Sequence, residues 1–306
     1  MRIAVPDLVS PSYFPAIAAV ELGLVRDEGV DLELELLFPV TDAARALRTG
    51  AIDFLAGAAH APMHAFPEWD GVTLVAALSQ HTYWFLVMRS DLGVGRDDLD
   101  ALRGVRIGAA PGPDLGLQVL LADAGIAPAE RGIVIGPVPQ AEGSGTSFGV
   151  AAAQALEDGV VDGFWANGMA AELAVRRGSG SLVIDARRGN RPSGLSAYTF
   201  PALAVTDDTV DRDPDAVAAV TRAVVRAQQL LRAEPQRAAD AAARVFPALE
   251  TSMMPELVRR DAPFYDARIT EGSARTLVDF GRRTELITST PSYDHIVSPH
   301  FRHLWR

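Results

Sequence analysis

The passage that decides the fold is residues 44–53, ARALRTGAID, together with its counterpart at residues 153–162, AQALEDGVVD. The two align without gaps. Each ends a helical pattern at a glycine, Gly50 or Gly159, and then enters a strand through an apolar residue and an aspartate. Glycine at that point is typical of a helix C-terminus, because it adopts a left-handed backbone at no steric cost. A helix-glycine-strand unit that occurs twice predicts two lobes of the same construction.

Chance similarity between the two passages is the competing explanation, because alanine-rich helices often end in glycine. The beginnings of the two halves also correspond, however. Arg2-Ile3 and Arg106-Ile107 each open a strand that leads to a proline-containing loop and a helix. This second agreement favours a repeat.

Short apolar runs alternate with helical stretches in both halves, which predicts an α/β fold with parallel strands joined by crossover helices. After residues 198–205 the chain is mostly helical. A segment rich in Gly and Ser, residues 140–149, is expected to be a mobile surface loop. The expected strands are 2–5, 31–37, 54–58, 73–78, 83–88, 106–109, 133–138, 163–165 and 181–185, and the expected helices are 13–22, 42–47, 113–124, 147–156, 214–232, 235–245, 255–261 and 273–286.

Composition excludes several classes of function. The chain has 306 residues, of which 48% are hydrophobic and 22% are charged, which fits about two ordinary domains. A net charge of -11 disfavours nucleic acid as a partner, since phosphate binding relies on clustered Lys and Arg. No apolar run reaches the ~18 residues of a membrane span. The absence of cysteine excludes disulfides and thiol chemistry.

The N-terminus, MRIAVP, has the pattern of a first strand and not of a secretory signal. We therefore expect a periplasmic or extracytoplasmic location if a signal peptide has been removed, and a cytoplasmic one otherwise.

Four passages resemble the NMT1/THI5-like group, the substrate-binding proteins of ABC importers for nitrate, sulfonates and thiamine-pyrimidine precursors. They are SYFPA at residues 12–16 before a helix, ELGLVRDEGVDL at 21–32, LRTGAIDF at 47–54 and LRGVRIG at 102–108. The order and spacing of the passages also agree with that group, and the resemblance covers roughly residues 1 to 285. No cofactor and no metal are expected.

The resemblance implies a type II periplasmic-binding-protein-like fold with two lobes, a hinge and an interlobe cleft. Lobe 1 would comprise residues 1–87 plus 199–306, including the C-terminal helices, and lobe 2 residues 88–198. The hinge would lie near residues 88–90 and 198–201. Such a protein closes around a small polar molecule and delivers it to an ABC-transporter permease.

Ligands of open α/β sheets lie beyond the carboxyl ends of the strands, so the residues that leave each strand are the candidate site. In the first lobe these are Ser10, Ser12, Tyr13, Thr41, Asp42, His60, Gln80 and His81, and in the second they are Gly112, Pro113, Asp114, Trp165 and Asn167.

Several of these residues indicate what the ligand is. Gly112 and Pro113, just before a helix, would present backbone N–H groups to an anion or a carbonyl. Asp42 and Asp114 are expected either to be N-cap residues or to accept hydrogen bonds from an amine. Trp165 and Tyr13 could stack on a planar ligand. A planar or amino-bearing molecule follows as the expected ligand.

Histidine supports two further interpretations. His60 is the preferred polar contact to the ligand. It lies four residues before His64, a spacing that would suit a metal on a helix, but Pro62 and the lack of a third ligand nearby argue against a metal site.

An intracellular enzyme on the same fold is the alternative function. It would be a dehydratase or decarboxylase that uses His60, His81 or Asp114 for proton transfer.

Overall fold

Two mixed sheets organise the chain in the computed structural model, which describes residues 1–138, 147–188, 192 and 194–306. Met1–His81 and Thr199–Arg306 form one unit, unit 1, and Thr82–Tyr198 form the other, unit 2. The predicted α/β class is confirmed. Of the expected surface loop at residues 140–149, all but the last three residues lie outside the described residues.

The sheet of unit 1 has the strand order β2-β1-β3-β10-β4. Strands β1, β2 and β3 are parallel, and β10 is antiparallel to both of its neighbours, β3 and β4. The carboxyl ends of the four other strands therefore meet at one edge of the sheet. The bounds are β1 (Arg2–Val5), β2 (Glu33–Leu36), β3 (Phe54–Ala58), β4 (Val72–Ala77) and β10 (Pro201–Thr206).

The sheet of unit 2 has the matching order β7-β6-β8-β5-β9, with β5 antiparallel to β8 and β9. The carboxyl ends of β6, β7, β8 and β9 thus share an edge as well. The bounds are β5 (Phe85–Arg89), β6 (Arg106–Ala109), β7 (Val134–Gly136), β8 (Gly163–Ala166) and β9 (Gly180–Asp185).

The antiparallel strand of each sheet follows, in sequence, the last parallel strand of the other unit: β5 comes after β4, and β10 after β9. The chain accordingly enters unit 2 between His81 and Thr82 and returns between Tyr198 and Thr199. Residues 82–87, assigned to the first lobe from the sequence, lie in unit 2, because β5 pairs with β8 and β9.

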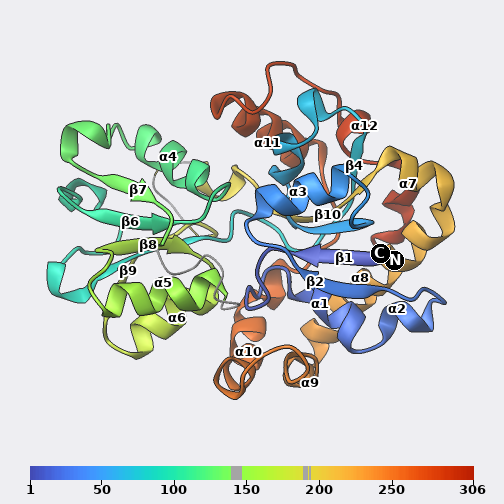
Figure 1. Ribbon diagram of the computed structural model, residues 1–306, viewed down its shortest axis with the longest axis horizontal. Helices are drawn as coiled ribbons and strands as arrows, with labels where there is room; N and C mark the ends of the chain where they lie inside the picture. The colour runs from blue at the N-terminus through green and yellow to red at the C-terminus, as the bar shows by residue number, and fades with distance from the viewer. Residues whose placement is uncertain (139–146, 189–191, 193) are drawn as a thin grey trace. The chain divides into compact units, whose positions relative to one another are not determined.

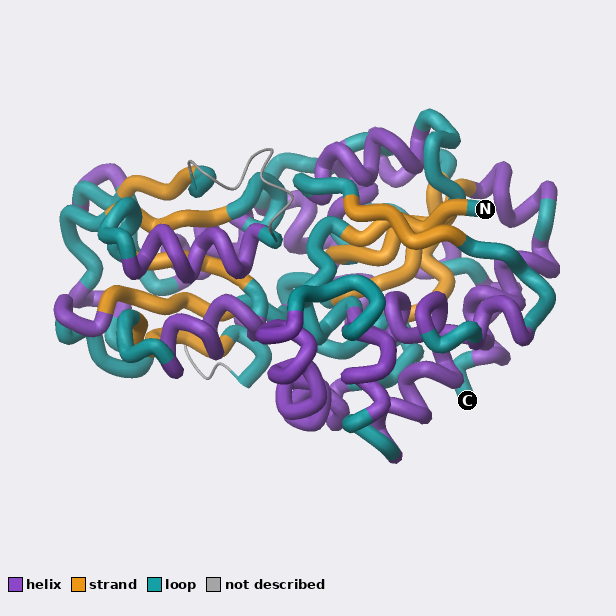
Figure 2. Tube along the Cα trace, turned by 60° about the horizontal axis from the view of Figure 1, so that its bottom comes forward, coloured by secondary structure: helices purple, strands orange, loops and turns teal. Residues whose placement is uncertain are grey.

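Helices cover both faces of the sheet of unit 1 (Figures 1 and 2). Figure 1 shows α3, α11 and α12 on one side and α1, α2 and α8 on the other. The bounds are α1 (Phe14–Glu21), α2 (Leu24–Asp27), α3 (Val40–Arg48), α7 (Asp207–Arg212), α8 (Pro214–Ala233), α9 (Arg237–Ala242), α10 (Ala248–Asp261), α11 (Glu271–Arg283) and α12 (Tyr293–Ile296).

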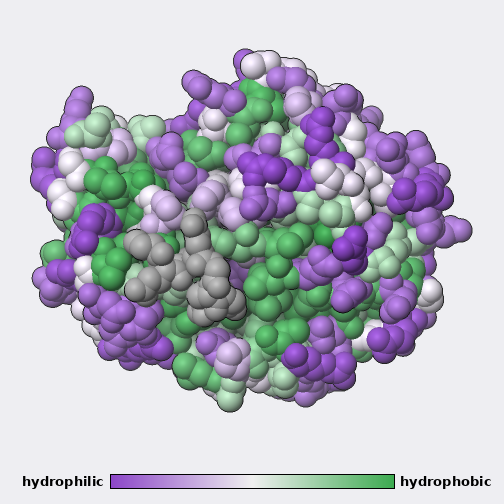
Figure 3. Space-filling view, viewed as in Figure 1, coloured by the Kyte–Doolittle hydropathy of each residue, from purple (hydrophilic) through white to green (hydrophobic). Residues whose placement is uncertain are grey.

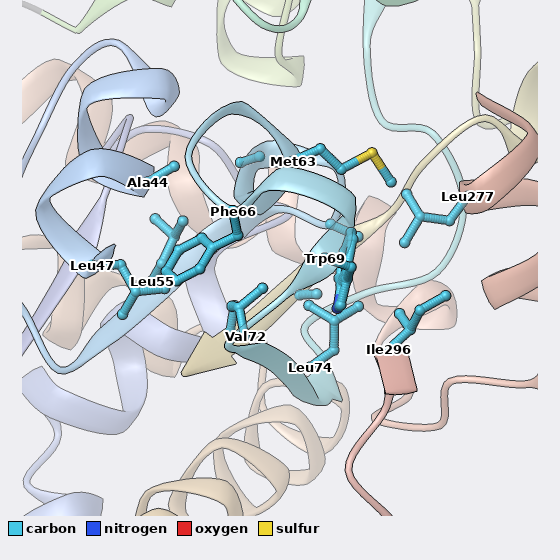
Figure 4. Packing of buried hydrophobic residues seen from close by; sticks show 14 of the residues in the cluster. Ala44, Leu47, Leu55, Met63, Phe66, Trp69, Val72, Leu74, Leu277 and Ile296 are labelled. Atoms are coloured by element: carbon cyan, nitrogen blue, oxygen red, sulfur yellow. The ribbon is translucent and has the colours of Figure 1, made fainter. Parts of the chain in front are cut away.

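A large apolar cluster fills the space between α3, α11, α12 and this sheet (Figure 4). Leu47 of α3, Leu55 of β3 and Leu277 of α11 are each at most 1% exposed, and Trp69 is fully buried among them. Because a fully buried side chain of this size contributes about 1.5 to 3 kcal/mol, the cluster fixes the sheet against the C-terminal helices.

In unit 2, α4 (Asp114–Asp123) packs on the face of the sheet that carries Trp84 and Trp165. The helices α5 (Phe148–Glu157) and α6 (Gly168–Arg176) pack on the opposite face, where Leu156 and Ala174 approach Gly180 of β9. Helix α6 was not expected from the sequence.

The repeated passage has the same backbone in both units. Gly50 (φ +71°) ends α3, and Gly159 (φ +70°) ends α5. The N–H of each glycine donates to the carbonyl three residues earlier, at 3.2 Å and 3.1 Å. The aspartate that follows accepts the N–H of the first strand residue: Asp53 from Arg2 and Asp162 from Arg106, both at 2.8 Å. The repeat inferred from the sequence is therefore structural.

Helix α10 begins earlier than expected. A start at Pro255 was expected, but α10 begins at Ala248 and contains that proline. Proline lacks the N–H that would bond to the preceding turn, which normally ends a helix. Burial of Met253, Met254 and Leu257 along one face compensates for the lost bond.

The C-terminal segment covers the free edge of β4. Ser298 donates its N–H to the carbonyl of Leu74 (3.0 Å), and the indole N–H of Trp305 donates to the carbonyl of Val75 (2.8 Å). An uncovered edge strand would offer unpaired backbone groups to other chains.

Figure 3 shows hydrophilic side chains spread over the visible face. Among the described residues, no helix is both long enough and apolar enough to cross a membrane.

Candidate functional site

The loop after β1 in unit 1 carries three of the expected site residues. Ser10 is fully buried, and its hydroxyl has no hydrogen-bond partner among the described residues. Ser12 donates to Asp261 Oδ2 (3.2 Å), and Tyr13 is the N-cap residue of α1 with its ring buried. The phenol of Tyr265 donates to the carbonyl of Pro11 (2.7 Å). These two hydrogen bonds hold the loop in place.

Thr41 and Asp42 lie in the first turn of α3. Thr41 is buried, but Asp42 is exposed and forms an ion pair with Arg45. The expectation that Asp42 caps the helix is wrong, because α3 starts at Val40 with Pro39 as its N-cap residue. A carboxylate in the first turn is still favourable, since it lies near the positive end of the helix dipole.

His60 is fully buried behind β3. Its Nδ1 lies 3.1 Å from Thr199 Oγ1, and its ring centre lies 5.2 Å from that of Phe280 in α11. The His64 ring is 6.1 Å away, and burial, with a smaller contribution from Arg45, lowers the pKa of His64 to about 4. Within the residues that the structure describes, no group of three His, Asp or Glu side chains could hold a metal.

Gln80 and His81 support the loop that follows β4. The Gln80 amide donates to the carbonyls of Asp266 (2.8 Å) and Arg268 (2.9 Å). His81 is exposed, has a φ of +68°, and meets the Phe264 ring edge to face with ring centres 5.8 Å apart. The geometry of Gln80 indicates a structural role, because both of its N–H groups bond to backbone.

In unit 2, Gly112, Pro113 and Asp114 form the turn between β6 and α4. Gly112 has a φ of +96°, which a residue with a β-carbon rarely adopts, and its N–H donates to Asp114 Oδ1 (2.9 Å). The expectation that Asp114 is the N-cap is wrong, because Pro113 holds that position and Asp114 is the first helical residue. Burial raises the pKa of Asp114, although hydrogen bonds from the backbone partly oppose this.

Trp165 lies within β8, and Asn167 is the first residue after that strand. Trp165 is fully buried under α4, where its indole N–H donates to the carbonyl of Pro113 (3.1 Å) and its ring lies 5.8 Å from that of Trp84. Asn167 is the N-cap of α6, and its Oδ1 accepts from the N–H groups of Met169 (3.0 Å) and Ala170 (3.2 Å). Trp165 therefore supports the turn that carries Asp114, and its buried ring gives no support to the expected stacking.

Two residues at the same edge were not among those selected from the sequence. Strand β9 ends at Asp185, and β8 ends at Ala166. Both residues pair with Phe85 of β5, so the two strands end at the same edge of the sheet. Arg187 follows two residues later and is only 4% exposed. The strand ending at Asp185 was expected, so applying the carboxyl-end rule to it would have found Arg187.

Comparison with known proteins identifies relatives of the chain. A family described as NMT1/THI5 like matches residues 10–238. A search of curated protein sequences gives no match.

Solved structures resemble the chain over nearly its whole length. A protein from Bordetella bronchiseptica RB50 has a TM-score of 0.76 at 20% identity, covering 99% of this chain and 96% of that one. The ligand binding component of an ABC-type import system from Staphylococcus aureus, with zinc bound, has a TM-score of 0.72 at 15% identity, covering 100% and 98%. The alkanesulfonate-binding protein SsuA from Xanthomonas axonopodis pv. citri, bound to MOPS, has 0.70 at 16%, covering 98% and 96%. At these identities the likeness concerns the fold.

Proposed function

Because the chain belongs to the NMT1/THI5-like family, we propose that it is the solute-binding component of an ABC-type importer and binds a small polar, amino-bearing molecule. The observation that carries this proposal is the matching construction of the two sheets. Each sheet gathers the carboxyl ends of four strands at one edge, and polar side chains follow those strands in both units.

The resemblance to import proteins of known structure supports the same function. The similar structures include a ligand binding component of an import system and an alkanesulfonate-binding protein. An importer of this kind requires a permease partner and an extracytoplasmic location, and both belong to the proposal.

The polar residues indicate which ligand chemistry fits. Asp114 supplies a partly buried carboxyl group whose pKa is raised by burial, so a cationic or N–H-rich group that pairs with it would stabilise its charged form. Ser10 supplies a buried hydroxyl that can donate or accept. An amine or aminopyrimidine suits Asp114 better than a simple oxyanion, which a carboxylate repels.

Thermal unfolding with a panel of amines, aminopyrimidines, alkanesulfonates and nitrate tests the proposal. A true ligand raises the melting temperature progressively with concentration, since 100 times Kd adds about 2.7 kcal/mol of stability. We expect amines and aminopyrimidines to act and nitrate to be inert. If only oxyanions raise the melting temperature, the assignment of an amino-bearing ligand is wrong.

Asp114→Asn is the matching variant, and it should abolish most of the shift. Asp158→Asn, which makes the same charge change at the exposed end of α5, is the control. Mass analysis of the recovered ligand separates binding from catalysis: an unchanged ligand is expected, and conversion would favour the dehydratase or decarboxylase alternative.

A further inference from the structure

A hollow in the surface of unit 1 is lined by two arginines. It is formed by the C-terminal turns of α8 and α10 and by the segments that follow these helices, and its volume is about 310 Å³. This volume is at the lower end of the range for small-molecule sites. None of its residues is among those selected at the strand ends. They are Arg232, Pro235, Arg259, Ala262 and Pro263.

Arg259 brings a positive charge to the hollow that the protein leaves unpaired. Its side chain is exposed in the last turn of α10, and it forms no hydrogen bond or ion pair within the described residues. The next residue, Arg260, differs, because its guanidinium lies 3.9 Å from Asp261. All five N–H donors of Arg259 are therefore open to solvent or to a ligand.

Arg232 brings the second positive charge. Its Nη1 donates to the carbonyl of Tyr265 (3.2 Å), which holds the side chain of α8 against the segment after α10. This bond uses one of five N–H donors, so the guanidinium can still bond to an acceptor in the hollow.

No acidic side chain lines the hollow among the residues that the structure describes. The nearby Asp266 bonds through both carboxylate oxygens to Nε of Arg268, each at 3.0 Å. The chain as a whole has 39 acidic and 28 basic residues, so a hollow with two cations and no acid departs from the average surface. Two positive charges at one place favour a ligand with more than one negative charge.

The remaining walls of the hollow are apolar and fixed. They consist of Pro235 and the start of the 3₁₀ turn Ala262–Phe264, which contains Pro263. Proline restricts the backbone, and the Phe264 carbonyl accepts the N–H of Gln80 (2.8 Å). An organic group would pack against walls that are already in place, which lowers the cost of ordering on binding.

We infer that this hollow is a second binding site of the protein, for a phosphate monoester whose organic part packs against the two prolines. A phosphate monoester has a charge of about −1.5 to −2 at pH 7 and three acceptor oxygens, which suits two guanidinium groups. A carboxylate has one charge only. The inference does not depend on the proposed function.

Isothermal titration of the wild-type protein at pH 8 and low salt tests the inference with phenyl phosphate, inorganic phosphate, benzoate and phenol. Phenyl phosphate should bind about fivefold or more tightly than inorganic phosphate, because its ring buries apolar surface. Benzoate should bind more weakly than phenyl phosphate, and phenol should not bind. Added salt should weaken the binding of phenyl phosphate. Absence of phenyl phosphate binding, or equal binding of phenol, overturns the inference.

Arg259→Gln should lower the affinity for phenyl phosphate about tenfold, and Arg259→Lys should lower it less. Folding of these variants is expected, since Arg259 is exposed. Arg244→Gln, which makes the same charge change at an exposed position after α9, is the control and should bind as the wild type does. Unchanged affinity in Arg259→Gln, or an equal loss in Arg244→Gln, contradicts the inference.

Arg232→Gln should also lower the affinity about tenfold. This variant loses the bond to the Tyr265 carbonyl, so its melting temperature is measured alongside. If it fails to fold, the Arg259 variants decide.

Two further measurements separate the hollow from other sites. Arg259→Gln should keep the rise in melting temperature that amines and aminopyrimidines produce, and loss of that rise would show that the hollow is not a separate site. Vesicles that contain phosphatidic acid test the source of the phosphate: sedimentation of the wild type with them, but not of Arg259→Gln, identifies a lipid headgroup, and binding of phenyl phosphate alone identifies a soluble monoester. If phenyl phosphate binds and the amine panel does not, the proposed function fails and this inference stands.

Discussion

The repeated passage gives unit 1 and unit 2 the same backbone but different side-chain surroundings. Asp53 accepts the Arg2 N–H, and its Oδ1 lies 4.0 Å from the guanidinium of Arg212. Asp162 accepts the Arg106 N–H and also pairs with the Arg106 guanidinium (3.0 Å) and with Arg89 (3.5 Å).

The residue after each aspartate differs even more. Phe54 is fully buried in unit 1, whereas the corresponding Gly163 in unit 2 lets the Met88 side chain approach the backbone. The backbone hydrogen bonds of the helix-glycine-aspartate-strand unit therefore define its shape. The side chains around it vary between units, as do the polar residues that follow each strand.

Substitutions at Phe54 and Gly163 should have the largest effects on the free energy of unfolding. Phe54→Ala should destabilise the protein by about 3 to 5 kcal/mol through the cavity it leaves. Gly163→Ala should cost about 1 to 3 kcal/mol, because the new β-carbon would lie 2.8 Å from the Val87 carbonyl oxygen. Denaturant unfolding measures both. Equal losses of stability in the two variants would contradict the difference in packing between the buried ring of Phe54 and the close contacts at Gly163.

Histidine provides the second contrast, because all six histidines belong to unit 1. Burial lowers the pKa of His64 from 6.5 to about 4. Between these two pH values the imidazole is protonated in the unfolded chain and neutral in the folded protein. The resulting stability is present above pH 6.5 and is lost as the pH falls toward 4, by on the order of 2 to 3 kcal/mol.

Unfolding experiments between these two pH values should therefore show a steeper pH dependence for the wild type than for His64→Phe. His300→Gln, which changes an exposed histidine of the same unit, is the control and should follow the wild type. An unchanged slope in His64→Phe would contradict the assignment.

The two repeat aspartates give the smallest effect. Asp162→Ala should cost about 2 kcal/mol and Asp53→Ala about 1 kcal/mol, since Asp162 pairs with two arginines at 3.0 Å and 3.5 Å, whereas the arginine near Asp53 lies 4.0 Å away. The Arg106 guanidinium lowers the pKa of Asp162 below 3.8.

The extra stability from Asp162 is therefore complete above pH 3.8 and disappears as the pH falls through the lower folded value. Melting temperatures of both variants at neutral and acidic pH check this. A gap between wild type and Asp162→Ala that persists in strong acid would contradict it.

Much of the fold could be predicted from sequence, because its signals are local. Gly50 and Gly159 mark helix ends through their backbone freedom, and the aspartates after them mark strand entry. Helix α10 could not be bounded in this way, because the buried methionines that hold it together across Pro255 owe their burial to distant residues.

The candidate site was harder to predict, because strand ends identify positions and not side-chain environments. Trp165 lies within β8 and is packed under α4, whereas Asn167 follows β8 and caps α6. Asp42 was misplaced because the helix starts at Val40, two residues before it. The burial of Arg187 depends on three-dimensional packing that the sequence alone does not reveal.

The position of β10 between β3 and β4 has a consequence for biosynthesis. Roughly 120 residues separate β4 from β10, so a ribosome working at 5 to 20 residues per second leaves the gap between β3 and β4 unfilled for about 6 to 24 s. Thr82–Tyr198 is continuous in sequence and is fully synthesised during that interval. The half of the protein that is translated first is thus completed last, and its open strand edges require protection from aggregation until Pro201–Thr206 emerge.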